Sequence, residues 1–418
     1  MLIHGRANRT GLRGKCGLVV IPALLGVLHA GCMENEMIAP EEIDDPDAHV
    51  TYFPGRGLNW KEKTASELGW DQATLADAVD YAVANEADIP TDLRGYLESR
   101  FEGLPDQDIL GPLKERGKMN GMILHRGYIV AEWGDTARTD VTFSVTKSLL
   151  GTTVGLALDR ELIRDVDDLV AEYVDDGGYA SPHNAMITWR HTLQQSSEWE
   201  GTLWGKPDTA DRREGRDRTL QDPGTFWEYN DVRVNRAALS AARVWGESLP
   251  EVLDREFMTP IGASRSWRWH GYRNSTVEIA GQEIESVAGG GHWGGGMWIS
   301  TRDMARVGLL YLRRGMWREE RVLSEEFIDA ALTPSELNPT YGYMWWLNTE
   351  GALWPSAPHE SFAARGGGDN MIWVDPVNEL VVVVRWIERG TQDGLLERIL
   401  AAAPPARRAA DSGREVVR

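Results

Sequence analysis

The chain is poor in cysteine and in lysine. Of its 418 residues two are cysteines, Cys16 and Cys32, and no Cys-x-x-Cys pair occurs. This excludes a disulfide framework, a cysteine-rich zinc site and an iron–sulfur cluster. Acidic residues outnumber basic ones by 64 to 44, which gives a formal net charge of −20, and the body of the chain has no basic run. Because nucleic acids attract positively charged surfaces, we expect no nucleic-acid partner.

Several signatures of catalysis and cofactor binding are also missing. No Gly-x-Ser-x-Gly occurs, so the nucleophile elbow of α/β-hydrolases is absent. No His-Glu-x-x-His or similar spacing offers paired metal ligands, and the glycine-rich run at 289–296 lacks the Lys-Ser/Thr of a phosphate loop. His191 and His292 are therefore interpreted as structural or cleft-lining residues. The sequence predicts neither a metal nor a cofactor.

The two ends of the chain differ from its body. Basic residues precede an apolar stretch from Cys16 to Ala30, which is typical of a signal peptide over residues 1–31 and too short to span a membrane. The following Gly31-Cys32 resembles the end of a bacterial lipobox, so Cys32 is the predicted lipidation site, with plain cleavage near Ala30 as the alternative. We expect an exported protein of the bacterial cell envelope, in the periplasm, that meets a membrane only through an N-terminal lipid anchor.

The remaining chain divides into three parts. Residues 32–50 are acidic and carry two prolines, which indicates a solvated tether, and residues 404–418 form a polar tail. Residues 51–403 are the expected folded body. The 18 tryptophans of the chain all lie in this body, and we interpret most of them as core residues and some as lining a substrate cleft.

Two predicted β-hairpins bracket this body. The first covers 121–134, and the second joins 371–374 to 380–387 through an Asp-Pro-Val-Asn-Glu turn. Apolar residues at helical spacing predict helices at 72–85, 144–159, 231–244, 301–313 and 394–403. Strands at both ends with helices between them indicate an α+β fold, in which an antiparallel sheet is flanked by helices and residues 160–290 form an inserted, mainly helical part.

Ser144 and Lys147 form the first candidate pair for chemistry. They are three residues apart at the start of a strongly apolar predicted helix, so their side chains share one face. A serine becomes a nucleophile when a neighbouring group takes its proton, and an amine is suited to assist. An ordinary N-cap serine with a solvated lysine is the alternative, but a lysine in so apolar a helix would otherwise be an unfavourable buried charge.

Further segments follow this pair in a recognisable order. Tyr229 lies 85 residues after Ser144, and Ala364-Arg365-Gly366-Gly367-Gly368 precedes the last hairpin. Together these segments resemble the serine β-lactamase and penicillin-binding protein superfamily, in its class C-like serine hydrolase branch. That branch also holds esterases, D-amino-acid peptidases and 6-aminohexanoate-dimer hydrolases. The resemblance covers residues 118–390 and includes the segments 187–193, 295–306 and 341–346.

The resemblance implies a β-lactamase/transpeptidase-like fold and a role for each matching residue. Ser144 would be the acylated nucleophile, Lys147 its hydrogen-bonded activator and Tyr229 the group that shuttles the proton. The backbone of Gly366 and Gly367 would complete an oxyanion hole with that of Ser144. The implied activity is that of a serine hydrolase acting on a small-molecule ester, an amide or a short peptide, without a cofactor.

Two positions depart from the family pattern. The second motif is Tyr-x-Asn in the family, but Asp231 stands at the Asn position here, and a carboxylate cannot donate the amide hydrogen bond that β-lactams use. If it points inward, it would also stabilise the charged form of Lys147 and favour Tyr229 as the base. The third motif is Lys-Thr-Gly or His-x-Gly in the family, whereas Arg365 occupies this region and can still bind a substrate carboxylate.

These departures leave three functional hypotheses. The leading one is an ester or amide hydrolase, and both changes lower the expected hydrolysis of penicillins. A β-lactamase or D-amino-acid peptidase of the same fold is the first alternative. A non-catalytic envelope protein that binds peptides or glycans is the second, although the intact Ser144, Lys147 and Tyr229 argue against it.

Overall fold

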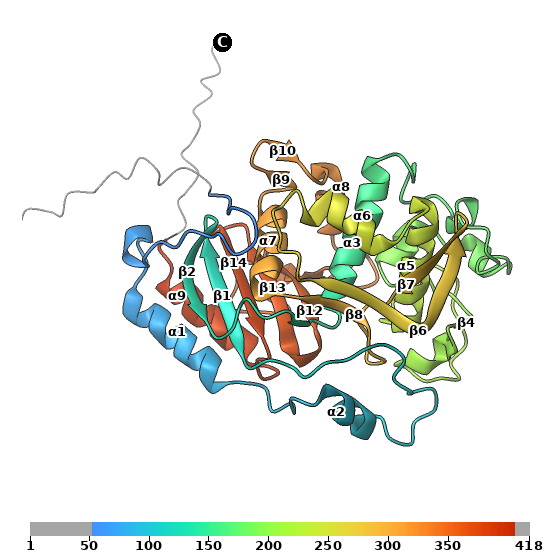
Figure 1. Cartoon of the computed structure of the whole chain (residues 1–418), viewed down its shortest axis with the longest axis horizontal. Helices are drawn as coiled ribbons and strands as arrows, with labels where there is room; N and C mark the ends of the chain where they lie inside the picture. Colours follow the sequence, from blue (N-terminus) through green and yellow to red (C-terminus); the bar gives the residue numbers. More distant parts are fainter. Residues whose placement is uncertain (1–51, 406–418) are drawn as a thin grey trace, which may run out of the picture. The chain divides into compact units, whose positions relative to one another are not determined.

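A six-stranded antiparallel sheet brings the two ends of the body together. The computed structural model describes residues 52–405. In spatial order, the strands are β11 (Trp346–Leu347), β12 (Phe362–Gly366), β13 (Asn370–Asp375), β14 (Leu380–Arg385), β1 (Asn120–His125) and β2 (Tyr128–Trp133). Strand β1 pairs with β14 along its whole length, so the two predicted hairpins lie side by side (Figure 1). The predicted α+β fold is confirmed.

The turns of both hairpins follow from their residues. Arg126 and Gly127 join β1 to β2 with φ angles of 54° and 88°, the conformation that a two-residue hairpin turn requires. Asp375 ends β13, and its Oδ1 accepts hydrogen bonds from the backbone N–H groups of Val377 and Asn378 at 2.8 and 3.1 Å. This Asx turn reverses the chain into β14.

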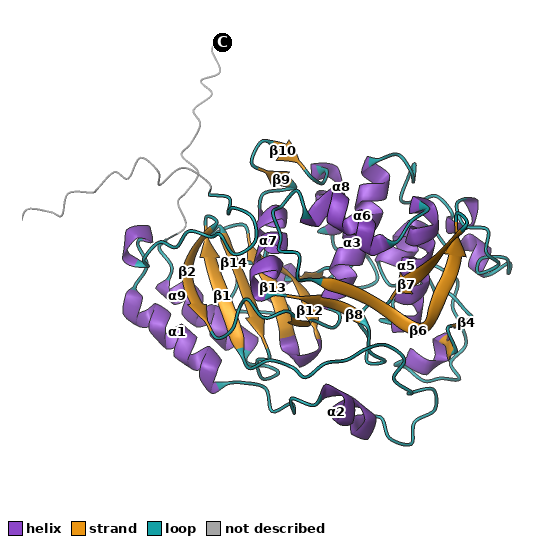
Figure 2. Cartoon of the chain, in the orientation of Figure 1, coloured by secondary structure: helices purple, strands orange, loops and turns teal. Residues whose placement is uncertain are grey.

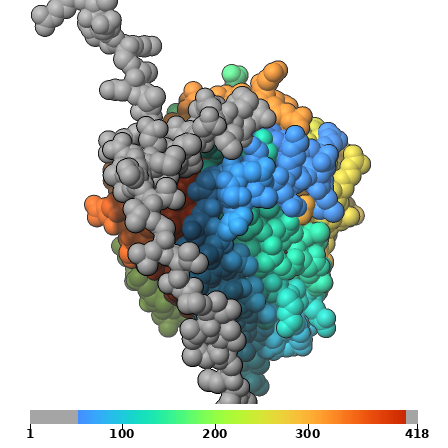
Figure 3. Space-filling view, turned by 90° about the vertical axis from the view of Figure 1, so that its left-hand side faces the viewer, coloured from blue at the N-terminus to red at the C-terminus, as the bar shows by residue number. Residues whose placement is uncertain are grey.

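Helices bury both faces of the sheet (Figure 2). One face packs on α3 (Val145–Asp159) and α7 (Thr301–Leu312), and the other on α1 (Gln72–Ala84) and α9 (Gln392–Ala402). Side chains alternate between the two faces: Val381 and Val383 of β14 belong to the first core, Val382 and Val384 to the second. Figure 3 shows the side of α1, where the blue surface of the N-terminal segment borders the turquoise surface of the first hairpin.

A second, four-stranded sheet stands beside the helices that carry the candidate residues. Its order is β3 (Asp140–Val141), β8 (Gly296–Ile299), β6 (Arg268–Ile279) and β7 (Gln282–Val287). Helix α5 (Asp231–Trp245) packs against both α3 and β7. The remaining elements are short: α2 (Leu93–Arg100), α4 (Trp189–Leu193), α6 (Leu249–Leu253), α8 (Glu325–Ala331), β4 (Thr202–Leu203), β5 (Lys206–Pro207), β9 (Met316–Trp317) and β10 (Glu320–Arg321).

All five predicted helices are present, with ends that differ by one or two residues. The hairpin of β6 and β7 was not predicted, although it lies within the segment 160–290. Its register shifts between Gly271 and Thr276, which interrupts the alternation of apolar and polar residues by which a strand is recognised. Short α2, which carries Gly95 among charged residues, also gave no helical signal.

The predicted signal peptide, the Cys32 lipidation site, the acidic tether and most of the tail lie outside the described residues. Among residues 52–405, no helix combines the length and the apolar composition needed to cross a bilayer.

Candidate active site

Ser144 stands immediately before the first residue of α3. The preceding residue, Phe143, has a φ of 48°, in the left-handed region that residues other than glycine rarely adopt. The Thr146 hydroxyl donates to the Phe143 carbonyl at 2.6 Å and holds this turn. Because the start of a helix favours negative charge, the position suits a serine oxygen that gains charge during a reaction.

Lys147 lies one turn further along α3 with its side chain 1% exposed. Its Nζ donates to Ser144 Oγ at 2.8 Å and to the Gly289 carbonyl at 3.1 Å, and lies 2.6 Å from Asp231 Oδ1. The predicted contact between the serine and the lysine is therefore present. The ammonium thus has two hydrogen-bond acceptors and one ion-pair partner, and such partners compensate for the burial of a charged lysine.

Asp231 points inward, whereas the side chain of its neighbour Asn230 caps a helix. The Asn230 side chain accepts from the N–H groups of Val232 and Arg233 at 3.0 and 3.2 Å and so caps α5. Asp231 is the first residue of that helix and pairs with Lys147. Burial raises the pKa of Asp231, but Lys147 and the other positive groups nearby together outweigh it and hold the pKa below its ordinary value.

Tyr229 lies over the same pair. Its ring centroid is 5.0 Å from Lys147 Nζ, and its side chain interacts with that of Ser144. The ring stacks on Trp346 with centroids 5.8 Å apart and meets Tyr341 edge-on at 6.2 Å. Burial, and then the charge of Asp231, raise the pKa of Tyr229, while the interaction with Ser144 and the charge of Arg213 lower it.

Strand β12 brings the glycine segment against the start of α3. A Cβ atom on Gly366 would lie 2.1 Å from the Thr142 carbonyl oxygen and 2.9 Å from the backbone nitrogen of Ser144. The two backbones therefore approach to a distance that only glycine allows. Gly367 lines the same cleft, and a Cβ there would contact the Phe143 ring at 3.1 Å.

Arg365 also lines this cleft. Its guanidinium lies 3.9 Å from Asp369 and over the rings of Trp346 and Trp354, 5.6 Å from each centroid. Burial lowers the pKa of Arg365.

The cleft has a volume of about 640 Å³, and Ser144, Tyr229, Asp231, Arg365, Gly366 and Gly367 all line it. Lys147 lies beneath its floor. Trp346 and Trp386 are the tryptophans among its lining residues, and most of the other tryptophans are buried in the core. The structure thus brings every candidate residue of the body to one place.

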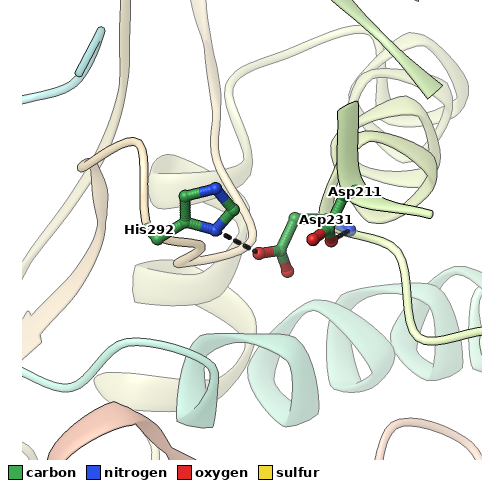
Figure 4. A group of neighbouring side chains, drawn as sticks. All are labelled: Asp211, Asp231 and His292. Carbon is green, nitrogen blue, oxygen red and sulfur yellow. Dashed lines mark hydrogen bonds and ion pairs between the residues drawn. The ribbon is translucent and has the colours of Figure 1, made fainter. Parts of the chain in front are cut away.

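The cleft also contains residues that the sequence did not single out for chemistry. Arg213 lines it from the loop before Tyr229, and Asp211 and His292 lie beside Asp231 (Figure 4). Asp211 accepts the backbone N–H of Asp231 at 2.7 Å. Burial and the charge of Asp231 raise the pKa of Asp211 to about 7. No motif or periodicity marks the loop that carries Asp211 and Arg213, so no sequence signal could have found them.

His292 is held as a neutral ring. Trp293 Nε1 donates to Gln107 Oε1 at 3.0 Å, which identifies that atom as an acceptor, so His292 Nε2 donates to it at 2.5 Å. His292 Nδ1 then faces Asp231 Oδ2 at 3.8 Å. Burial lowers the pKa of His292 to about 4, against the opposing charge of Asp231.

The ligand atoms of Asp211, Asp231 and His292 lie within 4.8 Å of one another, an arrangement that can hold a metal ion. However, Lys147 Nζ already lies 2.6 Å from Asp231 Oδ1, and the charge of Arg213 also acts on both carboxylates. A divalent cation would be repelled by both of these charges. The cluster therefore supports an ion pair better than a metal centre.

Comparison with known proteins places these residues in a family. The model of the family described as Beta-lactamase matches residues 123–402. The 6-aminohexanoate-dimer hydrolase of Paenarthrobacter ureafaciens is 24% identical over 387 residues, which cover 80% of this chain and 90% of that protein.

Solved structures show the same fold. A penicillin-binding protein homologue from Caulobacter crescentus superposes with a TM-score of 0.51 at 14% identity, covering 75% of this chain and 98% of the other. A family VIII carboxylesterase superposes with a TM-score of 0.51 at 16% identity, covering 76% of this chain and 97% of the other.

Proposed function

Since this chain belongs to the beta-lactamase family, we propose that it is a serine hydrolase that cleaves an ester or amide bond through an acyl-enzyme on Ser144. The observation that carries the proposal is the 2.8 Å hydrogen bond from Lys147 Nζ to Ser144 Oγ, at the start of a helix and beneath an open cleft. The relatives named as a 6-aminohexanoate-dimer hydrolase and a family VIII carboxylesterase support this choice of bond.

In the proposed reaction, Tyr229 acts as the base in its phenolate form. It takes the proton of Ser144 as Oγ bonds to the substrate carbonyl carbon, and then gives that proton to the leaving oxygen or nitrogen as the bond to carbon breaks. In the second half Tyr229 takes a proton from water as the water oxygen bonds to the acyl carbon, and it passes that proton to Oγ as the bond between the acyl carbon and Oγ breaks. The enzyme is regenerated with one water consumed.

Lys147 and the backbone would stabilise the charges that form. Asp231 favours the ammonium form of Lys147, which donates to Oγ and so stabilises negative charge there. The backbone N–H groups of Ser144 and of the Gly366–Gly367 segment would bind the carbonyl oxygen as it becomes an oxyanion.

The substrate is proposed to be a small-molecule ester, a simple amide or a short peptide. Asp231 stands where the amide of an asparagine would donate to a β-lactam side chain, and its carboxylate is already paired with Lys147. Penicillins should therefore react slowly. Arg365, at the cleft wall, remains available for a substrate carboxylate.

Labelling with a fluorophosphonate tests the nucleophile. The purified chain should gain one phosphonyl group, found on the peptide that contains Ser144, and the Ser144→Ala variant should gain none. A folded native chain that stays unlabelled, or a label on another residue, would overturn the proposed function.

We also propose export and lipid attachment at Cys32, on the basis of the sequence pattern over residues 1–32. The intact mass of the protein extracted from a bacterial membrane fraction should correspond to a chain that begins at a lipid-modified Cys32. The Cys32→Ala variant should lose both the lipid and the membrane association. An unmodified native chain in the soluble fraction would contradict the anchor.

A further inference from the structure

The proposed base needs a counter-charge that the known motifs do not provide. Burial and the charge of Asp231 both raise the pKa of Tyr229, so its phenolate is disfavoured in this site. The ammonium of Lys147 is near, but it is shared between Asp231, Ser144 and the Gly289 carbonyl. Arg365, the arginine of the third motif, lies over Trp346 and Trp354 and close to Asp369.

Arg213 contacts Tyr229 directly. Its Nε donates to the Tyr229 carbonyl at 3.0 Å, and its guanidinium carbon lies 4.8 Å from the centroid of the ring. A cation at this distance over an aromatic face is attracted to the ring, and more strongly once the ring carries a negative charge. Residue Arg213 is exposed and lines the cleft, so its charge does not incur the desolvation cost of a buried guanidinium.

The other arginines of the same loop are ion-paired. Arg212 lies 2.6 Å from Asp208, Arg216 lies 2.6 Å from Asp106, and Arg218 lies 2.6 Å from Glu198. Within residues 52–405, Arg213 has no carboxylate within ion-pair distance. Its charge therefore acts on the tyrosine without being held in an ion pair, although it also acts at longer range on Asp211 and Asp231.

The loop is held firmly enough to keep Arg213 in position. The backbone N–H of Arg213 donates to Glu228 Oε1 at 3.1 Å, and Glu228 immediately precedes Tyr229. The Glu228 carboxylate pairs with Arg218 at 2.5 Å and with Arg233 at 3.1 Å, and the Glu228 and Arg233 side chains are 2% and 3% exposed. Arg213 and Tyr229 are thus fixed to the same buried ion-pair network.

We infer that Arg213 is a positioning residue that stabilises the phenolate of Tyr229 and thereby enables it to take the proton of Ser144. This inference rests on the proposed function, because it assigns to Arg213 a role that acts through Tyr229. This chain lacks the Lys or His of the family's third motif. Arg213, which comes from a separate loop, supplies a positive charge at the tyrosine instead.

The test compares the rates at which full-length variants are labelled by a fluorophosphonate, over a series of reagent concentrations that reaches saturation. Such a series gives the maximal rate constant and the half-saturating concentration separately. A unit charge lost at about 5 Å in a partly solvated cleft should slow the maximal rate of Arg213→Gln by about 10-fold. The half-saturating concentration should stay within about twofold of the native value. Arg213→Lys keeps the charge and should recover most of the rate. Arg216→Gln, in the same loop but paired with Asp106, is the matched control and should label at the native rate.

A second comparison uses the Tyr229→Phe background. There Arg213→Gln should cause no further loss, because the group through which Arg213 acts is gone. The inference is overturned if Arg213→Gln labels at the native rate, if Arg213→Lys is as slow as Arg213→Gln, or if the same 10-fold loss persists without Tyr229.

These outcomes separate the inference from the proposed function. Labelling of native Ser144 together with an unaffected Arg213→Gln would overturn the role of Arg213 alone. Absence of labelling in the native chain, or a Tyr229→Phe variant that labels at the native rate, would overturn the proposed mechanism and this inference with it.

Discussion

Replacing Asp231 with Asn should destabilise the protein by an amount that the geometry sets. The change leaves the ammonium of Lys147 facing a neutral amide, in a place where the two side chains are 1% and 5% exposed and 2.6 Å apart. At an effective dielectric constant of about 20, two unit charges attract by about 4 kcal/mol at about 4 Å and by about 6 kcal/mol at the 2.6 Å of this pair. Removing one partner of a buried pair costs about 3–5 kcal/mol, since the other charge stays buried. For a folded body of about 350 residues, this corresponds to a melting temperature lower by about 5 °C.

A double-mutant cycle measures whether the two side chains act as a pair. Asp231→Asn, Lys147→Met and the double variant are compared by denaturant unfolding at pH 7. Because the pKa of Asp231 lies below its ordinary value, the contribution of the pair is present at neutral pH and is lost only as the pH falls through the acid range.

The double variant should lose less unfolding free energy than the two single variants lose together, by about 2 kcal/mol or more. The reason is that removing both charges leaves neither unpaired. If the losses of the two single variants add up to that of the double variant within about 0.5 kcal/mol, the reasoning is refuted. The ion pair would then not explain why Lys147 stays beneath Ser144.

Three further predictions concern the same site. Gly366→Ala places a Cβ 2.1 Å from the Thr142 carbonyl and should displace the backbone at Ser144, with a loss of about 100-fold in labelling rate; a native rate would show that the close approach is not needed. Asp211→Asn should stabilise the protein more at pH 8 than at pH 5. A carboxyl whose pKa is raised to about 7 lowers stability as the pH rises from its ordinary pKa to about 7, because the unfolded chain releases the proton that the folded chain keeps; equal melting shifts at both pH values would contradict this. Asp231→Asn restores an amide donor and should increase the rate of acylation by penicillin, measured by intact mass, and an unchanged rate would reject the role assigned to Asp231.

The order of the motifs along the chain was sufficient to predict the fold and to predict that Ser144, Lys147 and Tyr229 lie together. Ser144 and Lys147 share a helix face, so their contact is local and follows from the spacing of three residues. The two hairpins had turn residues between short apolar runs, and their pairing through β1 and β14 followed from their places at both ends of the body.

The rest of the site depends on contacts between distant parts of the chain. Arg213 reaches the cleft, and Asp211 reaches Asp231, because Glu228 and Arg233 tie their loop to the segment of Tyr229, and no local pattern encodes such a network. Whether Asp231 or Asn230 faced inward was likewise open in the sequence, since adjacent residues at a helix start can exchange roles. The structure resolves it, because Asn230 caps α5 and leaves Asp231 to pair with Lys147.

Direct observation of the acyl-enzyme tests the central claim most closely. The chain is mixed with a series of activated esters that differ in acyl chain length, quenched in acid within seconds, and measured as an intact mass. We predict a mass increase that matches each acyl group, located on the peptide of Ser144 and absent from Ser144→Ala. Ester turnover that continues in Ser144→Ala, or an adduct that lies on a different residue, would contradict the account.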